Sequence, residues 1–253
     1  MQLRSVNLTP EIVIVAALVV VVAYLVFGLT GFGSTVIALP LLAHVMPIKF
    51  AVPLLMLLDF AAFLTFGLRV RRGIRFDEIG WLVPTMLVGM AVGLTLLIRV
   101  VEGWLLGTLG VFVLCYAAYG LSRRGAPAQL ARWAGIPIGF LGGALSALFG
   151  TGGVLFAIYN AGRIPDKGEL RASNAAMIAL SSVLRLALFG ATGLLMQEGL
   201  WTLLALLLPA LAAGLLIGHR LHAAVPALAV VRVVHGVLLL AGASLCVRVW
   251  AGA

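Results

Sequence analysis

Long apolar runs separated by short polar stretches dominate the chain. Six of these runs have the length of one membrane-spanning helix, since about 20 apolar residues cross the roughly 30 Å hydrocarbon core of a bilayer. Apolar and polar residues do not alternate in ten-residue segments, as they would in a membrane β-barrel. The pattern therefore predicts an all-α polytopic membrane protein, with single spans at 50–68, 79–98, 103–121, 172–193, 200–218 and 225–247.

Two further apolar runs are interrupted near their middle by glycines together with Ser or Thr. They read "GLTGFGSTVIALP" at 28–40 and "LFGTGGVLFAIY" at 148–159. The first lies within 37 uncharged residues (12–48) and the second within 30 (133–162). As straight helices these segments would measure about 55 and about 45 Å, which is too long for one crossing. We expect each to form a tight helical hairpin that bends at its glycines.

Basic residues favour this hairpin interpretation. With two hairpins the chain has about ten membrane segments, and eleven Lys and Arg residues fall on one side of the membrane against four on the other. If each interrupted run crossed only once, the division would be nine against six. Because Lys and Arg collect in cytoplasmic loops, both termini are predicted outside and the following loops inside: 69–78, 122–132, 163–171 and 219–225.

Each half of the chain then contains one glycine-broken hairpin followed by three helices. Five segments is an odd number, so the second half enters the membrane inverted relative to the first. The predicted organisation is a first repeat at 1–121, a cytoplasmic connecting loop at 122–132 and a second, inverted repeat at 133–253. Inverted repeats with discontinuous helices are typical of secondary transporters, which bind substrate near the membrane midplane.

Composition agrees with this class and excludes others. Hydrophobic residues make up 63% of the 253 residues and charged residues 10%, against about 25% charged in soluble domains. The net charge of +9 lies in short clusters between apolar runs, which indicates a lipid bilayer rather than nucleic acid as partner. No H-E-x-x-H, G-x-S-x-G or Walker sequence is present. We expect a multi-pass protein of the inner cell membrane that is not an enzyme and has no cofactor or metal.

The glycine breaks are candidate anion sites. The sequence GFGS at 31–34 aligns with GTGG at 150–153. A helix that restarts after a break presents free backbone N–H groups and a partial positive charge. Two such starts facing each other would hold a small oxyanion; in the alternative interpretation the glycines only allow close helix packing. The candidate substrate ligands are Gly31, Gly33, Ser34, Thr35, Gly150, Thr151, Gly152 and Gly153.

Few other polar residues interrupt the apolar segments. Asp59 lies in the middle of a predicted span, where an ionisable residue is costly and often functional. It is a candidate carrier of a coupling proton, and a structural bond to a neighbouring helix is the alternative. In the corresponding span of the second half, Ser173, Asn174 and Ser181 are candidate substrate ligands, and Arg185 is placed to attract anions.

Three stretches, "GLTGFGSTVIALPLL", "GGALSALFGTGG" and "ELRASNAAM", resemble the TauE/SafE family of sulfite exporters and related permeases. The resemblance extends over roughly 12–247. It implies transport of sulfur-containing anions such as sulfite or sulfonates, driven by a proton or ion gradient. Where members often have a polar pair in the first repeat, this chain has Pro53, Leu54 and Leu55. By motif match the resemblance assigns substrate binding to Gly31, Gly33, Ser34, Gly150, Gly152, Gly153, Ser173 and Asn174.

The sequence thus predicts a secondary transporter of small sulfur-containing or organic anions. A passive anion channel built on the same helix starts is one alternative, and a non-transporting membrane protein that assembles with partners is another. The substrate, the direction of transport, the coupling ion and the formation of a homodimer all stay open at this point.

Overall fold

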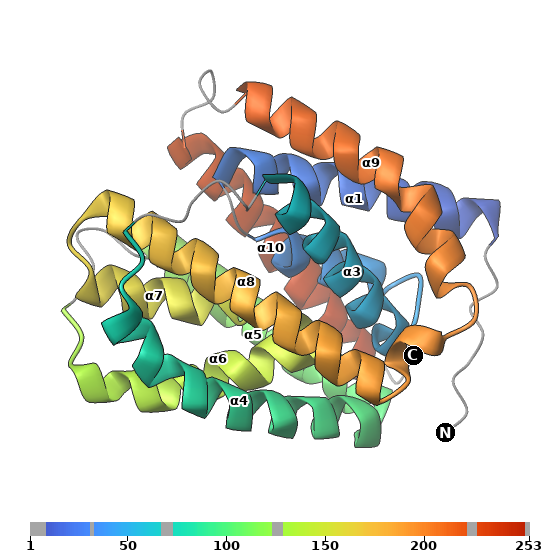
Figure 1. Cartoon of the computed structure of the whole chain (residues 1–253). Coiled ribbons are helices and arrows are strands. Elements are labelled where there is room, and N and C mark those ends of the chain that lie inside the picture. Colours follow the sequence, from blue (N-terminus) through green and yellow to red (C-terminus); the bar gives the residue numbers. More distant parts are fainter. Residues whose placement is uncertain (1–8, 31–32, 67–72, 123–128, 222–226, 251–253) are drawn as a thin grey trace. The chain divides into compact units, whose positions relative to one another are not determined.

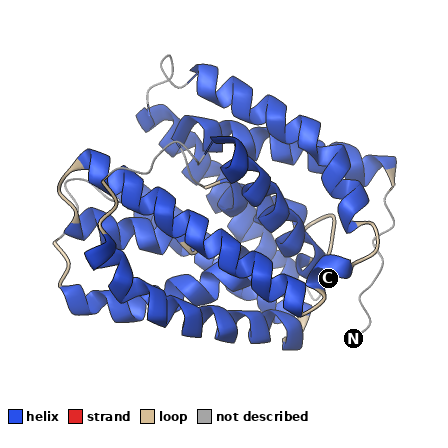
Figure 2. Ribbon diagram, in the orientation of Figure 1, coloured by secondary structure: helices blue, strands red, loops and turns tan. Residues whose placement is uncertain are grey.

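The computed structural model describes residues 9–30, 33–66, 73–122, 129–221 and 227–250. Within them the regular structure is helical and contains no strand (Figures 1 and 2), so the predicted all-α class is confirmed. The helices are α1 (Pro10–Thr30), α2 (Ser34–Leu42), α3 (Ile48–Phe66), α4 (Phe76–Arg99), α5 (Glu102–Ser122), α6 (Gly135–Phe149), α7 (Gly153–Arg163), α8 (Lys167–Ala191), α9 (Leu200–Leu221) and α10 (Ala227–Trp250).

Over its described residues, each predicted single span coincides with one helix; 67–68 and 225–226 lie outside the described residues. Seven helices of the described chain are long and apolar enough to cross a membrane: α1, α3, α4, α5, α6 with its preceding turn, α8 and α9. The largest difference is at α8, which begins at Lys167, five residues before the predicted span. Its first turn is polar, and Asp166 Oδ1 accepts the N–H of Glu169 at 2.8 Å, as in a helix N-cap. Apolar length alone could not locate this turn.

The two interrupted runs are each divided into two helices at their glycines. Gly33 adopts φ 91° directly before α2, and Gly150 adopts φ 73° directly after α6. The second arms are short, with nine residues in α2 and eleven in α7. At 1.5 Å per residue they measure about 14 and about 16 Å, about half of a hydrocarbon core. Each packs against the arm that precedes it.

The helices group into two compact units. The first consists of Met1–Leu58, Val100–Arg124 and Thr192–Ala253. Within it α1 packs along α9, and α5 packs along α10. Glycines allow close approach in the first of these pairs, because a Cβ at Gly214 would lie 2.6 Å from the carbonyl oxygen of Val21.

The second unit consists of Asp59–Arg99 and Gly125–Ala191. Here α4 lies alongside α6 (Figure 1), and α7 and α8 pack on α6. Gly89 and Gly93, four residues apart on α4, lie directly over backbone carbonyl groups of α6. Gly139 and Gly143 of α6 in turn lie directly against backbone carbonyl groups of α4. Such small-residue faces are the usual way for membrane helices to approach closely.

Candidate functional site

The break between α6 and α7 is built on a left-handed glycine. Gly150 donates its N–H to Ser146 O at 2.9 Å, and Thr151 donates its N–H to Leu145 O at 3.3 Å. The bond from Gly150, which has a positive φ, is the αL arrangement that ends many helices, and glycine fits it without steric strain. The chain therefore leaves α6 in a defined direction and restarts at Gly153 within three residues.

Several polar groups at the start of α7 have no hydrogen-bond partner in the part of the chain that the structure describes. The N–H groups of Gly152 and Gly153 find no acceptor among the described residues. The hydroxyl of Thr151 is buried, with the residue 2% exposed, and likewise finds no hydrogen-bond partner there. Leaving a buried polar group unpaired costs about 1–3 kcal/mol, and helix N-termini attract anions. This end of α7 thus presents donors without acceptors.

The break lies against α6 on one side and α8 on the other. A Cβ at Gly152 would overlap the carbonyl oxygen of Gly142 and lie 2.7 Å from the Cβ of Ser146. A Cβ at Gly153 would lie 3.4 Å from Ile178 of α8. Gly152 has φ −59°, so its special requirement is close approach to α6 rather than a left-handed backbone.

Ser146 connects three of the predicted site residues. Its Oγ lies 2.6 Å from Oγ of Ser181, and its carbonyl oxygen accepts a hydrogen bond from Nη1 of Arg185 at 3.3 Å. Nη2 of Arg185 in turn lies 3.9 Å from Oδ2 of Asp59. The predicted residues Ser181, Arg185 and Asp59 therefore gather beside the glycine break.

The other two predicted residues of α8 lie closer to its start. Ser173 Oγ accepts the backbone N–H of Arg75 at 3.0 Å. Asn174 Oδ1 accepts a hydrogen bond from Nδ2 of Asn160 at 2.7 Å. Asn160 is fully buried, and its own Oδ1 finds no partner in the described part of the chain. Asn174 precedes Ser181 by seven residues, or about 10.5 Å of helix. It therefore lies outside the Ser146 group, which consists of Ser146, Ser181, Arg185 and Asp59.

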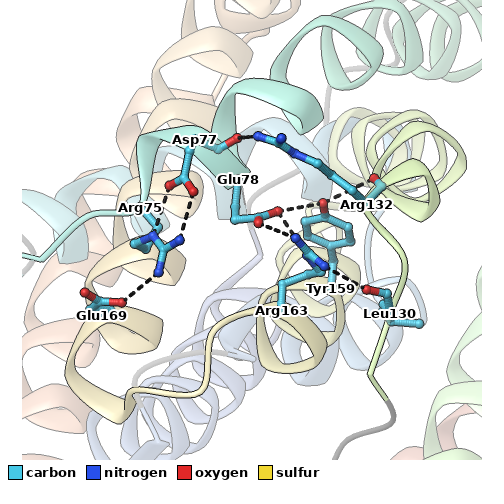
Figure 3. A network of polar contacts seen from close by, with 8 residues as sticks. All are labelled: Arg75, Asp77, Glu78, Leu130, Arg132, Tyr159, Arg163 and Glu169. Atoms are coloured by element: carbon cyan, nitrogen blue, oxygen red, sulfur yellow. Dashed lines mark hydrogen bonds and ion pairs between the residues drawn. The ribbon is translucent and has the colours of Figure 1, made fainter.

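A network of ionic contacts holds the first turn of α4 against the end of α7 (Figure 3). Glu78 accepts hydrogen bonds from Nη2 of Arg163 at 2.6 Å and from its Nε at 3.2 Å. Tyr159 donates its hydroxyl to the same carboxylate at 3.1 Å. Glu78 is buried, so this pair is a fixed element of the second unit.

Arg75 extends the network toward α8. It contacts Asp77 at 2.9 Å and Glu169 at 3.2 Å. Hydrogen bonds from the guanidinium, first to Asp77 and then to Glu169, raise the pKa of Arg75. Its charge is therefore permanent at any pH at which the protein is folded, and the contact is a constant link between the loop before α4 and α8.

The break in the first unit also has a left-handed glycine next to a helix start. Gly33 has a positive φ of 91° and directly precedes α2. Ser34 and Thr35 are buried in the first turn of this helix. Gly31 lies outside the described residues. Gly33, Ser34 and Thr35 thus lie together at the predicted helix start.

Sequence reasoning missed two residues of the second unit, Ser146 and Asn160. Both interrupt the uncharged run 133–162, and a polar side chain within such a run was a usable signal. Among the described residues, no three His, Cys, Asp or Glu side chains lie together in a way that could hold a metal ion.

Comparison with known families identifies the class of the protein. The profile of the family described as sulfite exporter TauE/SafE matches residues 16–245. The chain belongs to this family. A curated relative, the probable inner membrane transporter protein TsaS of Comamonas testosteroni, is 28% identical over 200 residues, which cover 78% of this chain and 83% of the relative. No solved structure matches. The protein is a membrane transporter of the TauE/SafE type, and the glycine breaks and the Ser146 group lie within the matched region.

Proposed function

We propose that this TauE/SafE-type protein carries a small sulfur-containing oxyanion, sulfite or an organic sulfonate, across the inner membrane, and that a proton or ion gradient drives the transport. The family description names sulfite export, and the relative's name places that protein in an inner membrane. The proposed binding residues are those of the two helix starts together with the polar side chains of α8.

The observation that carries the proposal is the buried hydroxyl of Thr151 beside the two N–H groups that open α7, all three of which have no hydrogen-bond partner within the described chain. An oxyanion supplies the acceptors that these donors lack. Arg185, which reaches the site through its bond to Ser146, supplies a positive charge close by. The two N–H groups, the Thr151 hydroxyl and Arg185 can thus bind an anion together, and few of the residues involved have bulky side chains.

Helix pairing supports the proposed inverted repeats. If the repeats are α1–α5 and α6–α10, then α1 and α6 are equivalent, and so are α4 and α9. In one unit α1 packs along α9, and in the other α6 packs along α4. Each hairpin would then pair with the fourth helix of the opposite repeat. This exchange is what a pseudo-two-fold relation between two interleaved repeats requires.

Thermal unfolding of the purified protein in detergent tests the binding of anions. The ligands are sulfite, methanesulfonate, sulfate and acetate, with chloride at the same ionic strength as the control. A ligand at 100 times its dissociation constant stabilises the folded state by about 2.7 kcal/mol. We expect sulfite or methanesulfonate to raise the unfolding temperature above the chloride control.

Flux measurements in proteoliposomes then separate the mechanisms. A secondary transporter accumulates the anion against its gradient when a proton or ion gradient is imposed. Equilibration without accumulation would identify a passive channel instead. If no anion of the set stabilises the protein and none crosses the membrane, the proposed function is wrong.

A further inference from the structure

A buried ion pair lies beside the proposed anion site. Asp59 Oδ2 and Arg185 Nη2 are 3.9 Å apart, and their side chains are only 14% and 4% exposed. Arg185 also donates to the carbonyl oxygen of Ser146, near the end of α6. The guanidinium is thus held between a carboxylate and a helix C-terminus, both of which favour its positive charge.

In sequence, the other ionisable residues of this unit lie away from both members of the pair. The remaining ionisable residues of the unit lie in 69–78, at 99, at 132 and in 159–171. None falls in α6, and α8 has none between Arg171 and Arg185. The charged group that α8 directs at Asp59 is Arg185. Without a ligand, the two charges sum to zero in this part of the apolar unit.

A bound anion changes that sum. Arg185 would then face two negative groups, the ligand and Asp59, and the site would carry an uncompensated charge of −1. A net charge within the membrane is expensive, and it is commonly neutralised by a counter-charge or by a change of protonation. One proton on the carboxylate of Asp59 restores a sum of zero and leaves Arg185 to the anion.

We propose that binding of one monoanion is accompanied by uptake of one proton on Asp59, so that the loaded site is electrically neutral. The step forms one O–H bond on the Asp59 carboxylate and transfers no electrons. This inference rests on the proposed function, because it assumes that the anion binds beside Arg185. It assigns the coupling ion as a proton, the ratio as one to one and the ligand class as singly charged oxyanions.

Selectivity by charge is a direct consequence. A sulfonate or hydrogensulfite ion carries one negative charge and is balanced by one proton. Sulfate, and sulfite without its proton, carry two charges and would leave the loaded site at −1. The other carboxylates of this unit, at 77, 78, 166 and 169, lie at the starts of α4 and α8 and are distant in sequence from both members of the pair. Monoanions are therefore accepted, and dianions of the same size are rejected.

Calorimetric titration with methanesulfonate at pH 7 measures the proton uptake. Titrations in two buffers of different ionisation enthalpy give the number of protons taken up per anion bound. We expect one for the wild-type protein and none for Asp59→Asn, which should still bind the anion. Glu169→Gln, which removes a carboxylate of the surface network instead, should keep the value of one.

The outcomes separate this inference from the proposed function. If methanesulfonate binds to the wild-type protein without proton uptake, the coupling is wrong while the anion site stands. If no anion binds, the proposed function fails and the inference fails with it. A wild-type value of one is informative even where Asp59→Asn does not fold. In proteoliposomes a pH gradient should then drive methanesulfonate uptake, and a membrane potential set by potassium and valinomycin should not.

Discussion

Glu78 on the first turn of α4 and Arg163 at the end of α7 form a two-pronged ion pair, with Glu78 Oε1 2.6 Å from Arg163 Nη2 and Glu78 Oε2 3.2 Å from Arg163 Nε. They are 85 residues apart in sequence. Tyr159 adds its hydroxyl to the same carboxylate. The contact fixes where the short arm of the hairpin ends relative to α4. It therefore helps to position the start of α7, the proposed anion site, at the opposite end of the same helix.

Glu78→Gln should destabilise the protein by about 3 kcal/mol. This is the lower end of the range for a buried ion pair that loses one of its two charged partners. The low value is expected because Arg163 is partly exposed and water can reach it. Thermal unfolding in detergent measures the effect. Glu169→Gln is the matched control, since its pair with Arg75 is solvent-exposed and exposed pairs contribute little. Equal stability of the two variants would contradict the structural role of Glu78.

Thr151→Val should weaken anion binding about tenfold, because a hydrogen bond to a charged group contributes about 1.5 kcal/mol or more. The same change should leave the unfolding temperature without ligand unchanged or higher, since the lost hydroxyl has no partner among the described residues. Thr151→Ser retains the hydroxyl and should bind normally. Titration of all three proteins with sulfite or methanesulfonate tests this. An unchanged affinity in Thr151→Val would remove the hydroxyl from the site.

Gly33 should tolerate Asn far better than Val. No atom lies within 4 Å of a Cβ at this position, yet φ is 91°, which Asn adopts more readily than a β-branched residue. Gly33→Val should therefore lose stability through backbone strain alone, by about 1–3 kcal/mol, and Gly33→Asn by clearly less. Comparison of the two unfolding temperatures checks this order. If both variants behave alike, the left-handed conformation is not what requires glycine here.

Gly152→Ala and Gly153→Ala should differ although the residues are adjacent. The first adds a methyl group that overlaps the carbonyl oxygen of Gly142, whereas the second finds 3.4 Å to a side chain of α8. We expect Gly152→Ala to lower the yield of monodisperse protein. Gly153→Ala should be neutral or slightly stabilising, since Ala is the better helix former. Size-exclusion chromatography in detergent distinguishes them, and a well-behaved Gly152→Ala would show that α6 can move away.

Single cysteines test the predicted orientation, after Cys115 and Cys246 have been replaced by Ala. Gln129→Cys should resist a membrane-impermeant thiol reagent in intact cells, because 122–132 is predicted to be cytoplasmic. Glu198→Cys, in a loop predicted outside, should react. Both native side chains are exposed in the structure, so a lack of reaction reports the membrane side. The reverse labelling pattern would overturn the assignment of both termini to the outside.

The sequence was most informative where helix length and glycine position decide the structure. Apolar runs predicted the helices because an apolar residue in the membrane has few alternatives to a helix. The breaks at 33 and 150 were predicted because glycine clusters are costly inside a helix. The bond between Ser146 and Ser181 could not be predicted, since it depends on how α6 and α8 pack. The Glu78–Arg163 pair escaped prediction for the same reason, with 85 residues between its members.

The pairing of α1 with α9 determines the order in which the molecule can assemble. Tyr24 and Gly214, which meet across this interface, are 190 residues apart, so at about 5–20 residues per second α1 waits roughly 10–40 s for its partner to be synthesised. The second unit ends at Ala191 and is complete before α9 emerges. During synthesis the unit with the Thr151 break can therefore form first, while the face of α1 that packs on α9 stays open to lipid, insertion factors and proteases until almost the whole chain has been made.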